Sequence, residues 1–316
     1  MDSPLSNLSA CIRQKDRTIS DHSRLVLGTA QLGMPYGIAN RSGQPEKSTA
    51  YKIVKTAWDN GICEFDTAEA YGKSEQILGQ IIEDLGLTDK AKITTKPHPD
   101  LNHLDQGAMI QAIEQSLDRL NVNKLHCVML HREEMLALWQ EGLCEILQSF
   151  VRKGMADHVG VSVYSPKSAI QAIRTEGIDI VQLPANILDR RFEKAGIFES
   201  AQEQDKEIYI RSVFLQGLLL MPPKELPPNM IIASPFLDDI RAIARKSNIP
   251  LHHLALGYMK ATQPKAKLII GAEQESQLKE VISNADMELP LEVIQEILNK
   301  FYDIDEKIIN PTLWQR

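Results

Sequence analysis

Four side chains that can hold or move a proton follow short apolar runs of the sequence. Asp66 ends the run ICEFD, Tyr71 comes five residues later, Lys96 ends AKITTK and His131 ends CVMLH. A phenol has a pKa of about 10, so it exchanges protons readily at neutral pH only when a cation lies nearby. Lys96 is a candidate for that cation, and a buried lysine keeps its charge best beside a carboxylate such as Asp66. A neutral His131 can donate a hydrogen bond to a carbonyl oxygen, so the set suits carbonyl reduction.

Each of these residues also has a structural alternative. Asp66 could cap a loop, Tyr71 could pack as an aromatic residue, Lys96 could be exposed, and His131 could bind a buried carbonyl. We favour a shared chemical role because the residues follow three successive strand-like runs. A Schiff base on Lys96, in a barrel enzyme of another class, is a further reading, although an Asp66 partner opposes it by keeping the lysine protonated.

Strand-like runs alternate with longer segments of helical period from residue 24 almost to the end of the chain. Such alternation favours parallel strands connected by helices. Eight units in roughly 250 residues match a closed (β/α)₈ TIM barrel of the α/β class better than a doubly wound sheet. The predicted strands are residues 24–30, 62–66, 91–96, 125–131, 157–162, 178–183, 207–212 and 267–270.

Polar residues and glycines mark the ends of several predicted helices. Ser48, Ser74 and Asp105 are suitable N-caps, whereas Gly61 and Gly86 are suitable stops. No linker divides the chain, so we expect a single domain over residues 1–316, with a polar N-terminal segment (1–22) and a C-terminal helix and tail (291–316).

Two segments leave alternatives open. The proline-dense run at 221–230 is either a stiff flap over a ligand or a surface connection, and Trp314 either covers the barrel mouth or packs outside.

The composition argues against several classes of binding partner. The net charge is -7, which disfavours nucleic acid and anionic membranes as partners. Four scattered cysteines, with no CxxC pair, favour reduced thiols in the cytoplasm and indicate no metal site. No run approaches the roughly 20 apolar residues that a membrane span requires. The oligomeric state is not predicted.

The sequence resembles the aldo-keto reductase superfamily between about residues 24 and 285. The segments that match are LGTAQLG, FDTAEAYGKSEQILG, KITTK, VMLH, GVSVY, VQLPANILDRR, RSVFLQGLL and LIIGAEQESQL, in the order of the family. The resemblance implies an NADPH-dependent reductase in which Tyr71 is the general acid, Lys96 and Asp66 tune it, and His131 orients the carbonyl. It also implies a cofactor site formed by Gly28, Thr29, Asp66, Ser162, Gln182, Arg211, Ser212, Leu215, Gly217, Gly271, Glu273 and Gln277.

Four positions depart from the family pattern. Val163 replaces a common asparagine, and Arg211 replaces the aromatic residue on which the nicotinamide ring usually stacks, although a guanidinium can also stack on a ring. Gln277 replaces an arginine often used for the adenosine 2′-phosphate, and Glu273 adds negative charge nearby, with Lys279 as a candidate positive partner. The resemblance favours NADP(H), with NAD(H) as the alternative.

The substrate pocket is expected to include Met34 and Tyr36, from the loop after the first strand. Aromatic residues make up only 5% of the chain, so a mixed pocket for a small aldehyde, ketone or sugar-like carbonyl compound is favoured. The alternative function is a dinucleotide-binding, redox-sensing regulatory subunit with residual catalysis.

Overall fold

The computed structural model describes residues 21–283, 285 and 287–314. Most of the predicted N-terminal segment, with Cys11, and the last two residues of the predicted tail therefore lie outside the described residues. No helix within the described part of the chain is both long and apolar enough to cross a membrane.

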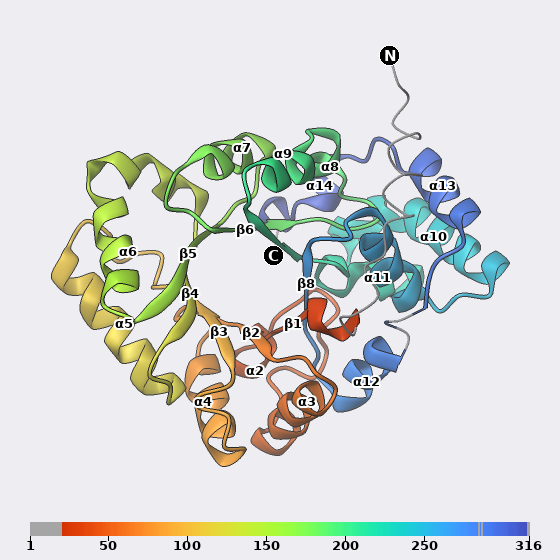
Figure 1. The fold of residues 1–316 in the computed structure, drawn as a ribbon. Coiled ribbons are helices and arrows are strands. Elements are labelled where there is room, and N and C mark those ends of the chain that lie inside the picture. The colour runs from red at the N-terminus through yellow and green to blue at the C-terminus, as the bar shows by residue number, and fades with distance from the viewer. Residues whose placement is uncertain (1–20, 284, 286, 315–316) are drawn as a thin grey trace.

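Eight parallel strands form a closed barrel in sequence order, which confirms the predicted (β/α)₈ class. The last strand closes the barrel against the first, with Leu25 paired to Leu268. Figure 1 shows the strands in the centre and the helices around them. The strands are β1 (Leu25–Gly28), β2 (Glu64–Asp66), β3 (Lys92–Thr95), β4 (Leu125–Leu130), β5 (Ala156–Ser162), β6 (Ile180–Pro184), β7 (Glu207–Arg211) and β8 (Lys267–Ile270).

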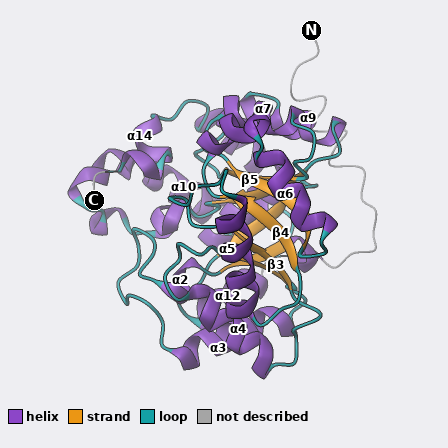
Figure 2. Ribbon diagram, turned by 90° about the vertical axis from the view of Figure 1, so that its left-hand side faces the viewer, coloured by secondary structure: helices purple, strands orange, loops and turns teal. Residues whose placement is uncertain are grey.

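Helices enclose the strands on the outside of the barrel, as Figure 2 shows from the side. The α-helices are α2 (Ala30–Gly33), α3 (Lys47–Asp59), α4 (Ser74–Asp84), α5 (Gln106–Leu120), α6 (Leu143–Arg152), α7 (Pro166–Arg174), α8 (Arg191–Lys194), α9 (Ile197–Glu203), α10 (Ser234–Ser247), α11 (Leu251–Thr262), α12 (Glu275–Ser283), α13 (Leu291–Lys300) and α14 (Glu306–Ile309). Short 3₁₀ helices are η1 (Asp21–Arg24), η2 (Glu133–Glu141), η3 (Leu215–Leu220), η4 (Pro223–Glu225), η5 (Pro228–Ala233) and η6 (Pro311–Leu313).

The predicted helix ends are confirmed in part. The Asp105 side chain caps α5 by accepting a hydrogen bond from the Ala108 N–H, and Gly61 and Gly86 have the positive φ of a helix stop. The other two predicted caps are wrong. Helix α3 begins one residue before Ser48, and the Ser74 hydroxyl donates instead to Thr29 O at 2.8 Å, because tertiary contact takes it away from its own helix.

The strand alternation separates two cores. Phe65 points outward into the large apolar cluster between strands and helices, whereas its neighbours Glu64 and Asp66 lie on the opposite face of the same strand. A small cluster inside the barrel contains Val26, Cys127, Met129, Ile180 and Tyr209. One polar cluster lies on each side of this apolar layer, at the two ends of the barrel.

The N-terminal end of the barrel carries a group of four polar residues, the floor cluster (Glu64, His126, Tyr209 and Lys267). Lys267 Nζ lies 2.8 Å from Glu64 Oε1, and the Tyr209 hydroxyl donates to Glu64 Oε2 at 2.8 Å. His126 Nε2 lies 3.2 Å from the same hydroxyl. These bonds tie strands β2, β4, β7 and β8 together across the barrel.

Candidate active site

The four residues predicted to do chemistry meet at the C-terminal end of the strands and form the mouth cluster (Asp66, Tyr71, Lys96 and His131). Lys96 Nζ donates to Asp66 Oδ1 at 2.7 Å and to Thr67 O at 3.0 Å. The same nitrogen lies 5.4 Å from the centre of the Tyr71 ring, which meets the His131 ring edge-on at 5.6 Å. The structure thus places the four side chains together, while their catalytic roles stay predictions.

A buried polar chain extends from this pair into the barrel. Gln182 Nε2 donates to Asp66 Oδ1 at 2.7 Å, and Gln182 Oε1 accepts from the Ser162 hydroxyl at 3.2 Å. Asp66 Oδ1 therefore accepts hydrogen bonds from both Lys96 and Gln182. Because the Lys96 side chain is 0% exposed, its charge is balanced within the protein.

The hydroxyl of Tyr71 is held in its protonated form. Burial first, and then the negative charge of Asp66, raise the pKa of Tyr71 well above its usual 10.0, with Arg211 opposing the shift. The sequence predicted a cation that would ease ionisation of the phenol, but the net shift goes the other way. The physical reason is that burial of the ring and the negative charge of Asp66 outweigh the opposing charge of Arg211. A hydroxyl that keeps its proton remains available as a donor.

The His131 ring is neutral over the ordinary pH range. Burial and then the nearby charge of Lys96 lower the pKa of His131 to about 3. Its Nδ1 is buried and has no hydrogen-bond partner among the described residues. A neutral ring can donate only one hydrogen bond, so His131 can orient a carbonyl oxygen without carrying charge into the site.

Close backbone contacts fix the loop that carries Tyr71. A Cβ on Gly33 would lie 1.9 Å from Tyr71 O, and a Cβ on Gly72, whose φ is +58°, would lie 2.5 Å from Gly33 O. The turn after β1 therefore packs directly against the turn after β2, and only glycine allows this approach. The Ser74 hydroxyl also contacts Thr29 Oγ1 at 2.8 Å, which joins the two loops.

Two cavities meet at Tyr71. The long cavity, of about 600 Å³, extends from Asp66 and Tyr71 to Glu273 and Gln277 at the start of α12. The short cavity, of about 810 Å³, is lined by Tyr71, His131, Met34, Tyr36, Arg132, Tyr164, Asn229 and Trp314 among others. Met34 and Tyr36 both line the short cavity, and Tyr36 also lines the long one, while their part in substrate binding stays a prediction. Trp314 lines the short cavity, which places it at the barrel mouth and not on the outside of the barrel.

The proline-dense segment borders both cavities. Met221, Pro222 and Glu225 line the long cavity, whereas Pro227 and Asn229 line the short one. This position fits the flap alternative better than a remote surface connection.

The long cavity collects most of the residues predicted to bind a cofactor. Its lining includes Gly28, Thr29, Asp66, Gln182, Arg211, Ser212, Gly217, Gly271, Glu273 and Gln277. Ser162 and Leu215 do not line it. The Ser162 hydroxyl donates a hydrogen bond to Gln182, and the Leu215 side chain is fully buried in the core. Sequence reasoning missed Gln31, Phe214 and Val281, which also line this cavity.

The loop after β7 supports a phosphate-bearing ligand. Ser212, Leu215 and Gln216 have positive φ values of 61°, 49° and 54°, and Gly217 follows at 90°. Non-glycine residues in this region cost about 1 kcal/mol or more each and gather at ligand clamps. Such turns also aim backbone N–H groups into anion-binding concavities. The loop therefore fits the phosphate groups of a dinucleotide.

Arg211 is already stacked on an aromatic ring of the protein. Its guanidinium carbon lies 4.1 Å from the centre of the Tyr164 ring, and its Nη2 donates to Val163 O at 3.2 Å. The two departures from the family pattern are therefore adjacent and bonded to each other. Arg211 lines the long cavity and Tyr164 lines the short one, whereas Val163 is fully buried and lines neither.

The chain is similar to known reductases in sequence and in fold. The model of the Aldo/keto reductase family matches residues 24–300. The aldo-keto reductase YhdN of Bacillus subtilis is 26% identical over 205 residues, covering 62% of this chain and 60% of that protein.

Two solved structures share the fold. The holo form of aldo-keto reductase AKR11C1 from Bacillus halodurans superposes with a TM-score of 0.72 at 22% identity, covering 90% of this chain and 95% of that one. A Klebsiella pneumoniae aldo/keto reductase in complex with NADP and acetate has a TM-score of 0.67 at 21% identity, covering 88% and 91%.

Proposed function

Because this chain belongs to the aldo/keto reductase family, we propose that it is an NAD(P)H-dependent oxidoreductase that reduces an aldehyde or ketone to an alcohol. The observation that carries the proposal is the position of Tyr71, whose side chain lines both cavities. A coenzyme in the long cavity and a carbonyl compound in the short one would meet beside this hydroxyl.

The residues of the mouth cluster take separate parts in the reaction. A bound reduced nicotinamide dinucleotide supplies the hydride to the carbonyl carbon. Tyr71 gives its proton to the carbonyl oxygen, which becomes the alcohol hydroxyl, and the tyrosine then recovers a proton from solvent. Neutral His131 holds the same oxygen by a hydrogen bond.

Lys96 and Asp66 act on Tyr71 through their charges. The ammonium of Lys96 stabilises the negative charge that remains on Tyr71 after the proton has left, since Nζ lies 5.4 Å from the ring centre. Asp66 holds that ammonium at 2.7 Å, and Gln182 fixes the carboxylate. Gln182, Ser212, Gln216 and Gly271 are the groups we assign to hold the coenzyme.

The short cavity suits a small carbonyl compound, sugar-like compounds included. Its lining combines the rings of Tyr36, Tyr164 and Trp314 with the polar groups of Arg132 and Asn229. Cys63, Cys127 and Cys144 are free, which supports a reducing, cytoplasmic setting as part of this proposal. The NADP complex of the Klebsiella pneumoniae relative supports a nicotinamide dinucleotide as coenzyme.

Turnover of an activated aldehyde tests the proposal. We expect purified protein to oxidise NADH or NADPH in the presence of 4-nitrobenzaldehyde, followed by coenzyme absorbance, with formation of the benzyl alcohol. Tyr71→Phe should lose at least about a hundredfold in rate, the scale of a missing general acid, while coenzyme binding by fluorescence titration is retained.

Three other outcomes would count against the proposal. Equal rates in both proteins would refute the role of Tyr71. Tight coenzyme binding without turnover would favour the redox-sensing subunit, and trapping of substrate on Lys96 by borohydride would favour a Schiff-base enzyme.

A further inference from the structure

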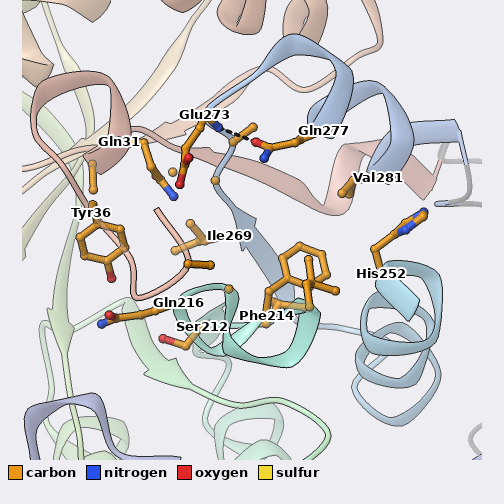
Figure 3. Close-up of a pocket in the computed structure, with 18 of the residues that line it drawn as sticks. Gln31, Tyr36, Ser212, Phe214, Gln216, His252, Ile269, Glu273, Gln277 and Val281 are labelled. Atoms are coloured by element: carbon orange, nitrogen blue, oxygen red, sulfur yellow. Dashed lines mark hydrogen bonds between the residues drawn. The ribbon is translucent and has the colours of Figure 1, made fainter. Parts of the chain in front are cut away.

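The lining of the long cavity near α11 and α12 is acidic, and we call this part the adenosine end. This adenosine end consists of Phe214, His252, Glu273, Gln277, Glu280 and Val281. Figure 3 shows Phe214, Val281 and His252 on one side, whereas Glu273 lies beside Gln31 near the start of α12. Phe214 and Val281 offer an apolar surface of the kind on which an adenine ring packs.

We propose that Glu273 selects NADH over NADPH by accepting a hydrogen bond from the adenosine ribose and repelling a 2′-phosphate. The inference rests on the proposed function, and it reverses the coenzyme preference that the family resemblance implies. A carboxylate beside this ribose is the feature that favours NAD in other dinucleotide sites, whereas an arginine accommodates the phosphate of NADP.

The amide groups that could bind a phosphate at the start of α12 are already occupied. Gln277 Oε1 accepts a hydrogen bond from Glu273 N at 2.8 Å and another from Gln274 N at 3.1 Å, of which Figure 3 shows the first. The residue that replaces the usual arginine therefore caps its own helix. A 2′-phosphate would have to displace this side chain, which carries no positive charge.

The basic side chains near the adenosine end already have protein partners. Lys279, the candidate positive partner for Glu273, lies 2.6 Å from the carboxylate of Glu275. His252 Nδ1 lies 3.2 Å from Glu280. Arg41 also lines the cavity, one residue before Ser42, and donates to the backbone oxygen of Glu225 at 3.3 Å; it is the rival residue for a phosphate.

Glu273 is placed to accept a further hydrogen bond. The Ser42 hydroxyl donates to its Oε2 at 3.2 Å, which fixes the carboxylate at the cavity wall. Burial raises the pKa of Glu273, with the Ser42 bond opposing the shift, so the group is partly withdrawn from water. A ribose hydroxyl can donate to it, whereas a phosphate dianion cannot.

Binding measurements without hydride transfer test the proposal. We would titrate the wild type with NADH and NADPH, and with ADP-ribose and 2′-phospho-ADP-ribose, by isothermal calorimetry. We expect the wild type to bind NADH and ADP-ribose at least about tenfold more tightly than their phosphorylated partners, a difference of about 1.4 kcal/mol.

Three variants sharpen the test. Glu273→Gln should reduce that ratio at least about tenfold, chiefly by tighter binding of NADPH, and Glu273→Gln with Gln277→Arg should reverse it. The matched control is Glu145→Gln, because that carboxylate pairs with Arg152 on α6 and does not line the cavity; it should leave the ratio unchanged.

The outcomes separate this proposal from the function. Tighter binding of NADPH by the wild type, or an unchanged ratio in Glu273→Gln, would overturn it, and a loss of NADPH binding in Arg41→Met would assign the phosphate to Arg41 instead. Selective NADH binding without aldehyde reduction would support the assignment of Glu273 while refuting the proposed reductase. If neither dinucleotide binds, both proposals fall.

Discussion

The two ends of the barrel carry the same four kinds of side chain in different surroundings. The mouth cluster pairs Asp66 with Lys96 beside Tyr71 and His131, and the floor cluster pairs Glu64 with Lys267 beside Tyr209 and His126. In the floor cluster the tyrosine hydroxyl is bonded to Glu64 at 2.8 Å and lies 3.1 Å from Lys267 Nζ. In the mouth cluster the tyrosine lines two cavities, and its hydroxyl has no hydrogen bond to other described residues.

The electrostatics of the two clusters differ in the same way. Burial by itself would raise the pKa of Glu64, but the hydrogen bonds and charge of Lys267, together with the Tyr209 bond, lower it. The Glu64 carboxylate of the floor cluster thus holds strands of the barrel together. Residue types alone therefore do not identify an active site. The floor cluster stabilises the fold because its hydrogen bonds are complete, whereas the mouth cluster can act on a ligand because its proton donor faces a cavity.

Matched double variants give the largest expected contrast. Asp66→Asn with Lys96→Met, and Glu64→Gln with Lys267→Met, each remove one carboxylate and one ammonium and leave the net charge unchanged. We expect the mouth variant to lose at least about a hundredfold in kcat/KM, because Tyr71 loses its supporting charge. The floor variant should keep kcat/KM within about threefold. Steady-state kinetics on folded protein would measure this, and similar losses in both variants would remove the distinction between the two ends.

Removing the floor hydroxyl should affect stability alone. Tyr209→Phe leaves Glu64 and Lys267 without one partner inside the barrel, so we expect a loss of about 1–3 kcal/mol in the free energy of unfolding. The measurement is urea denaturation followed by circular dichroism. The counterpart Tyr71→Phe should unfold at nearly the wild-type urea concentration. A stable, inactive Tyr209→Phe protein would contradict the structural role of the floor.

The smallest effect concerns acid. Burial, opposed by Glu64, lowers the pKa of His126 to about 4, below its ordinary 6.5. As pH falls from about 6.5 to about 4, His126 takes up a proton in the unfolded chain before it does so in the folded chain, so the free energy of unfolding decreases. His126→Gln should reduce that loss by at most about 1 kcal/mol per pH unit, since the ring is partly exposed. Denaturation at pH 7 and pH 5 would show it, and an unchanged pH dependence would assign the acid sensitivity to other groups.

The sequence by itself determined the barrel and the neighbourhood of the site. The strand periodicity placed Asp66, Lys96 and His131 at strand ends, and parallel strands bring such ends to one face of a barrel. The helix ends at Gly61 and Gly86 could also be predicted from the sequence, because a left-handed backbone conformation is a local property.

Only the tertiary structure decided how these side chains are used. It assigned Ser74 to Thr29 instead of its own helix, and it raised the pKa of Tyr71 where sequence suggested a lowering. It also turned Gln277 onto its own helix start and Lys279 onto Glu275, which leaves Ser42 as the partner of the Glu273 carboxylate. Hydrogen-bond partners and burial depend on groups that are distant in the chain, so no local pattern could supply them.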